Sequence, residues 1–145
     1  MRAAVTCTAL LLVGGSFTAA EPPDVSLVQL IATPERFDGK HVQVVGYCWL
    51  ESEDDALYLS RDDQANMVYR NSIWLSVSRE DREKWLGMRG NFVAVSGTFR
   101  ADFQGHMGMS SGAMEKIDAI RVWSDPKRPG VPPPPKPNPG RTKRP

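Results

Sequence analysis

Apolar and polar residues alternate in short runs along the middle of the chain, and this alternation predicts five β-strands. The runs fall at residues 42–50, 56–60, 73–77, 91–100 and 114–123. Gly46 interrupts the first run, and a glycine inside a strand is typical of the bend that a small barrel requires. A glycine-rich connection separates the last two runs, so we expect them to pair as a hairpin.

Two short helices are predicted beside the strands. Ser26 is followed three positions later by Gln29, which is a capping-box pattern, and apolar residues at 27, 30 and 31 share one helical face. Ser78 precedes a polar segment at 79–86 that Gly87 ends. The first helix stands before the first strand, and the second lies between the third and fourth strands.

Five strands in this order predict a mainly β protein: a five-stranded OB-fold-like Greek-key barrel with a short N-terminal helix and a short helix between strands 3 and 4. The segments that carry a family resemblance are Leu27-x-x-Leu30, the run from Pro34 to Lys40, Val44-Val45-Gly46 and Val93-x-Val95-x-Gly97. They resemble bacterial exported OB-fold proteins of the tRNA-anticodon-like type, whose function is uncharacterised. The resemblance covers residues 26–123 and implies the fold.

Residues 1–20 are predicted to be a secretory signal peptide. Arg2 precedes an apolar run at 3–13, and small residues lead up to a cleavage position after Ala20. Cys7 lies inside the apolar run and not at its end, so we expect export without a lipid anchor. The predicted location is periplasmic or secreted, and Cys48 is then the one remaining cysteine, expected to be a small buried hydrophobe.

Charge and proline content divide the rest of the chain in two. Residues 21–124 hold 16 acidic and 11 basic residues, whereas residues 125–145 hold one acidic residue, six basic residues and nine of the 12 prolines. The second segment is predicted to be a disordered basic tail, either inert or associated with an anionic surface. The acidic balance of the first segment makes nucleic acid an unlikely partner for the expected monomer.

The sequence carries no recognisable catalytic constellation. Its two histidines, His41 and His106, belong to no zinc, triad or kinase signature, and no nucleophile stands in a pattern with a base. The acidic pairs Asp54-Asp55 and Asp62-Asp63 lack the rhythm of a calcium loop and are expected to be solvated turns. We therefore expect a protein that is not an enzyme and needs no cofactor.

Two groups of residues could contact a ligand. Tyr58 and Trp74 could offer aromatic surface on strands two and three, although packing within the barrel explains them as well. The glycine-rich connection could form a nest for a small ligand or an anion, or could be purely structural. The candidate ligand-binding residues are Tyr58, Trp74, Gly105, His106, Gly108 and Ser110.

The same connection allows a soft-metal interpretation. His106, Met107 and Met109 offer one imidazole and two thioethers, which suit Cu(I) or Ag(I), whereas structural packing of the methionines is the plainer explanation. The predicted function is an exported, non-catalytic binding module for a protein, a peptide or a small envelope ligand. The alternatives are a periplasmic soft-metal binding protein and a structural domain associated with the envelope.

Overall fold

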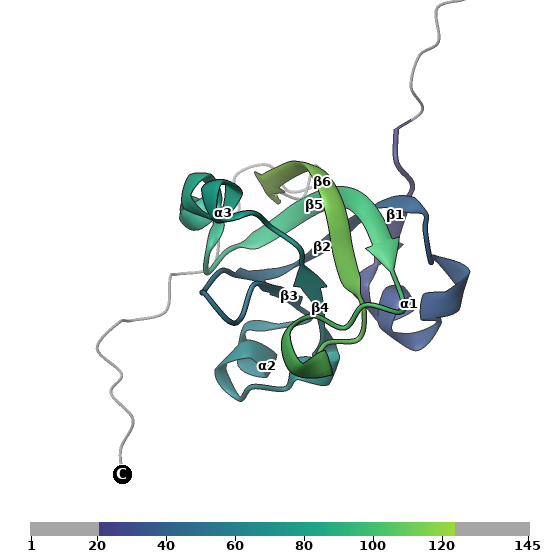
Figure 1. Ribbon diagram of the computed structural model, residues 1–145, viewed down its shortest axis with the longest axis horizontal. Coiled ribbons are helices and arrows are strands. Elements are labelled where there is room, and N and C mark those ends of the chain that lie inside the picture. The colour runs from purple at the N-terminus through teal and green to yellow at the C-terminus, as the bar shows by residue number, and fades with distance from the viewer. Residues whose placement is uncertain (1–20, 124–145) are drawn as a thin grey trace, which may run out of the picture.

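The computed structural model describes residues 21–123, and Figure 1 shows their arrangement. The predicted leader at 1–20 and the predicted tail at 125–145 lie outside this range. The strands are β1 Asp24–Ser26, β2 His41–Trp49, β3 Ala56–Tyr58, β4 Ser72–Leu75, β5 Phe92–Arg100 and β6 Ala113–Val122.

Five of these strands close a barrel. The sheet runs in the order β2-β3-β4-β6-β5, and β5 pairs back onto β2. β4 and β6 pair in parallel, whereas the other pairs around the barrel are antiparallel. The predicted hairpin is present as the antiparallel pair of β5 and β6. The expectation of a mainly β, OB-fold-like barrel is confirmed.

Short helices connect and cover the strands. The α-helices are α1 Leu27–Ala32, α2 Arg61–Ala65 and α3 Arg79–Trp85, and the 3-10 turns are η1 Pro34–Arg36, η2 Tyr69–Asn71, η3 Leu86–Met88 and η4 His106–Gly108. The predicted capping box begins α1: the Gln29 amide donates to Ser26 Oγ at 3.2 Å, and the Ser26 amide donates to Gln29 Oε1 at 3.0 Å. Both predicted helices are therefore confirmed.

Four elements differ from the sequence-based expectation, among them β3, which ends at Tyr58 and not at Ser60. β1 was not predicted, because three residues are too short to show a period; it pairs in parallel with β2 and buries Val25. α2 was not predicted either, since its sequence has no apolar face, and it is held by Ser60, whose hydroxyl accepts from the Asp63 amide at 3.0 Å. β4 ends at Leu75, so Val77 lies beyond the strand.

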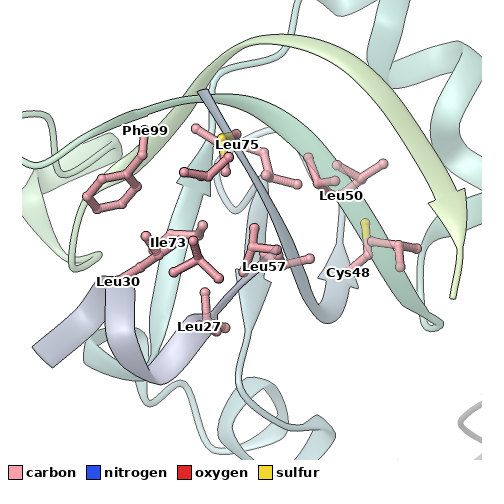
Figure 2. Close-up of a cluster of buried hydrophobic side chains, with 14 residues drawn as sticks. Leu27, Leu30, Cys48, Leu50, Leu57, Ile73, Leu75 and Phe99 are labelled. Carbon is pink, nitrogen blue, oxygen red and sulfur yellow. The ribbon is translucent and has the colours of Figure 1, made fainter. Parts of the chain in front are cut away.

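The core of the barrel joins α1 to the inward faces of the strands. Figure 2 shows Leu27 and Leu30 of α1 pointing into the same cluster as Leu57 and Ile73, and all four side chains are buried. Burying one such leucine stabilises the fold by about 1.5–3 kcal/mol. Cys48 lies in the same cluster, as expected, and burial raises the pKa of its thiol to about 12, with Asp55 adding to the shift.

Candidate functional site

Two loops far apart in the sequence line one cleft of the barrel. The β2–β3 loop spans residues 50–55 and the β5–β6 loop spans residues 101–112. The cleft has a volume of about 650 Å³, and we call it the loop cleft. Its lining residues are Leu50, Glu51, Ser52, Glu53, Asp54, Tyr69, Arg82, Leu86, Arg89, His106, Met107 and Met109.

The wall that the β2–β3 loop contributes is acidic. Glu51, Glu53 and Asp54 line it, and the Tyr58 hydroxyl donates to Asp54 Oδ1 at 2.8 Å. Burial raises the pKa of Asp54 above its ordinary value, although the hydrogen bond from Tyr58 opposes the shift. A carboxyl group that has lost part of its hydration gains from a cationic or hydrogen-bond-donating ligand.

The two arginines of the loop cleft are already paired within the protein. Arg82 Nε lies 2.9 Å from both carboxylate oxygens of Asp55, whose side chain is 1% exposed. Arg89 pairs with Glu51, and its guanidinium lies 4.0 Å from the centroid of the Trp49 ring. Among the ion pairs of residues 21–123 none involves Glu53 or Asp54, so no cation pairs with these two acidic residues of the wall.

The β5–β6 loop is anchored to β4. Gly105 lies against the Trp74 ring with φ +69°, and a Cβ at this position would come within 2.5 Å of Trp74 Cγ. The Trp74 amide donates to the Gly112 carbonyl at 2.9 Å, and the Ser111 amide donates to the Ser72 carbonyl at 2.9 Å. These contacts hold the loop in one position, so the side chains at its tip are presented by a fixed backbone.

The candidate residues of this loop fall into two groups. Gly105 and Ser110 are anchors: Ser110 is 3% exposed, and its hydroxyl lies 3.3 Å from the Ser72 hydroxyl. His106 is exposed and lines the loop cleft, whereas Gly108 lines a neighbouring hollow. The structure thus brings His106 and Gly108 to the surface and uses the other two residues to support them.

The two aromatic candidates do not form a stacking platform. Tyr58 has an exposure of 0%, which agrees with packing within the barrel, the alternative that the sequence allowed for it. It lies in a cluster with Tyr47 and Ala56, and burial is the largest cause that raises the pKa of its hydroxyl. Trp74 is half-buried, and the Gly105 backbone lies over its ring. Packing within the fold explains both aromatic residues.

The acidic pairs are not simple solvated turns, contrary to expectation. Asp55 is buried against Arg82, because a turn that closes onto α3 removes it from water. Asp63 lies in α2, where its amide donates to the Ser60 hydroxyl at 3.0 Å. Its carboxylate accepts from that hydroxyl through Oδ2 and from Asn71 Nδ2 through Oδ1 at 2.7 Å. Hydrogen bonds from Ser60 and Asn71 lower the pKa of Asp63.

Several lining residues were not singled out from the sequence. Glu51, Leu86 and Arg89 belong to the loop cleft, and Met67 joins Met107 at a neighbouring hollow. Their sequence context is ordinary, since a solvated turn, a helix end and a loop carry the same residue types. Only the closure of the barrel brings these segments together.

No three His, Cys, Asp or Glu side chains gather as a metal-binding group within residues 21–123. Within residues 21–123, no helix has the length and apolar character that a membrane-spanning helix needs.

Comparisons with known proteins give one structural likeness. No protein-family model and no curated protein matches the sequence. The fold is similar to part of the crystal structure of a candidate aspartyl-tRNA synthetase from Leishmania major Friedlin, with 16% sequence identity and a TM-score of 0.41. The match covers 77% of this chain and 22% of that one.

Proposed function

We propose that this chain is an exported, non-catalytic binding module, and that the loop cleft holds a protein segment, a peptide or a small ligand. The observation that carries the proposal is the anchored β5–β6 loop, whose exposed tip lines the same cleft as the acidic β2–β3 loop. In OB barrels the loops between strands 1 and 2 and between strands 4 and 5 border the binding face. The five barrel strands of this protein are β2 to β6, so these positions correspond to the β2–β3 loop and the β5–β6 loop.

The lining of the cleft favours a ligand that is both basic and apolar. Glu53 and Asp54 supply negative charge on one side, while Leu86, Met107 and Met109 supply apolar surface. Exposed methionines adapt to irregular apolar partners, because their side chains are unbranched and polarisable. A polyanion would meet an acidic wall, so nucleic acid is a poorer ligand than a cationic peptide.

The test uses the full chain and two labelled peptides of equal length, one alternating lysine with leucine and one alternating glutamate with leucine. We expect the lysine peptide to bind and Glu53→Lys to weaken its binding by at least about tenfold. Glu35→Lys is the matched control, because Glu35 is an exposed residue of η1 outside the cleft and its substitution changes the charge by the same amount.

Two outcomes would contradict this function. Equal losses in Glu53→Lys and Glu35→Lys would mean that the peptide senses overall charge and not the loop cleft. Tighter binding of a single-stranded oligonucleotide than of the lysine peptide at low salt would place the protein among nucleic-acid binders instead.

Export belongs to the same proposal and rests on the sequence of residues 1–20. Expression of the full chain in a bacterium, followed by N-terminal sequencing, should give a mature protein that begins at Glu21. A protein that retains Arg2 in the cytoplasmic fraction would refute export while leaving the binding module untouched.

A further inference from the structure

We propose that Met67, Met107 and Met109 form a thioether site for a monovalent soft cation, Cu(I) or Ag(I), with the His106 imidazole beside it. This metal site is separate from the ligand binding proposed for the loop cleft, and the inference does not depend on that function. The three methionines line one hollow of about 390 Å³ together with Val68, Tyr69, Arg70 and Gly108. Met67 comes from the connection between α2 and η2, and the other two come from η4 and the residue that follows it.

The exposure of two of these methionines sets them apart from packed core residues. Met67 is 61% exposed and Met107 is 80% exposed, whereas Met114 is fully buried. An exposed thioether contributes little to the core, and its sulfur is open to a ligand. The packing explanation that the sequence allowed for the loop methionines therefore does not account for Met107.

The backbone at both positions is held in an unusual conformation. Met67 has φ +55° and Met107 has φ +56°, and Lys116 is the one other non-glycine residue with positive φ among residues 21–123. Side chains disfavour this region by about 1–2 kcal/mol per residue. Neighbouring hydrogen bonds hold the two turns: the Met67 amide donates to the Gln64 carbonyl, and the Gly108 amide donates to the Gly105 carbonyl. Two strained turns thus present two methionines to one hollow.

The surroundings favour a soft monovalent ion over a divalent one. Thioether sulfur is a soft and neutral ligand, which suits Cu(I) and its analogue Ag(I). His106 lines the loop cleft together with Met107 and Met109, so we propose that its imidazole joins the thioether ligands from the side of the loop cleft. Arg70 lines the methionine hollow and adds positive charge, which penalises a doubly charged cation more than a singly charged one.

The test is a titration of the full chain, labelled with ¹³C in its methionine methyl groups, with silver nitrate in a chloride-free buffer. We expect one equivalent of Ag(I) to shift the methyl signals of Met67, Met107 and Met109. The signals of Met88 and Met114 should stay in place, since Met88 packs against the core and Met114 belongs to it. Zinc added at the same ratio should shift none of the three.

Matched variants separate ligation from packing. Met67→Leu keeps the apolar volume and removes a ligand sulfur, so it should weaken Ag(I) binding by at least about tenfold, the smallest loss expected even for an outer-shell partner of a metal site. Met88→Leu is the control and should bind as the parent does. Unmoved Met67 signals, or equal affinities of Met67→Leu and the parent, would overturn the proposal. Lysine-peptide binding measured on the same variants reports on the loop cleft separately.

Discussion

The contact between Gly105 and Trp74 allows a quantitative test of how the binding loop is held. Gly105→Ala should lower the free energy of unfolding by about 2–6 kcal/mol, because two penalties add. The backbone at Gly105 has φ +69° and ψ −159°, which costs a residue with a side chain about 1–3 kcal/mol. A Cβ would lie 2.5 Å from Trp74 Cγ, and relieving such an overlap costs about a further 1–3 kcal/mol.

Two other glycines separate these penalties. Gly39 has φ +71° with nothing within 4 Å of a Cβ, so Gly39→Ala should cost only the backbone term of about 1–2 kcal/mol. Gly87 lies in η3 outside the left-handed region and has the same open surroundings, so Gly87→Ala should change stability by less than about 0.5 kcal/mol.

The assay is urea unfolding of the full chain, followed by tryptophan fluorescence and by far-ultraviolet circular dichroism. The free energy of unfolding should be highest for Gly87→Ala, lower for Gly39→Ala and lowest for Gly105→Ala, with similar m values for the three variants. If Gly105→Ala were as stable as Gly39→Ala, the Trp74 ring would be free to move aside. The β5–β6 loop would then not be anchored as described, and the support for the loop cleft would be lost.

Two further predictions concern buried groups. Arg82→Met should lower the free energy of unfolding in urea by about 2–3 kcal/mol, because it leaves the buried Asp55 carboxylate without its partner. This loss is smaller than the roughly 3–5 kcal/mol of a fully buried pair, since the Arg82 side chain is 24% exposed. Arg79→Met, which breaks an exposed pair with Glu83, is the control and should cost less than about 0.5 kcal/mol. Equal losses in the two variants would contradict the buried pairing. In a Cys7→Ser variant, which leaves Cys48 as the single cysteine, the Cys48 thiol should not react with Ellman's reagent at pH 8 in the folded protein, because burial raises its pKa to about 12. It should react fully in urea, and rapid labelling of the folded variant would show that the thiol is accessible.

The sequence pointed to part of the candidate site, the tip of the β5–β6 loop. The glycine-rich connection drew attention to His106, Met107 and Met109, because such a composition in a hairpin loop is conspicuous. The sequence left Tyr58 open as an aromatic contact or a packed residue, since alternation along a strand does not say whether the outward face is covered. In this protein Tyr47 and Ala56 pack with Tyr58 in a second buried cluster.

By itself the sequence determined the positions of the main strands and helices. The alternation of apolar residues placed β2, β5 and β6, and the side-chain caps at Ser26 and Ser78 placed α1 and α3, because these preferences act over a few neighbouring residues. The order of these elements was enough to predict the barrel.

Long-range contact is what only the tertiary structure decided. Three features join segments 27 to 40 residues apart: the pairing of Asp55 with Arg82, the contact of Gly105 with the Trp74 ring, and the hollow that both Met67 and Met107 line. A local pattern holds no information about such partners, because each depends on how the closed sheet turns its loops toward one another. The fold therefore follows from short-range preferences, whereas the site depends on the closure of the barrel.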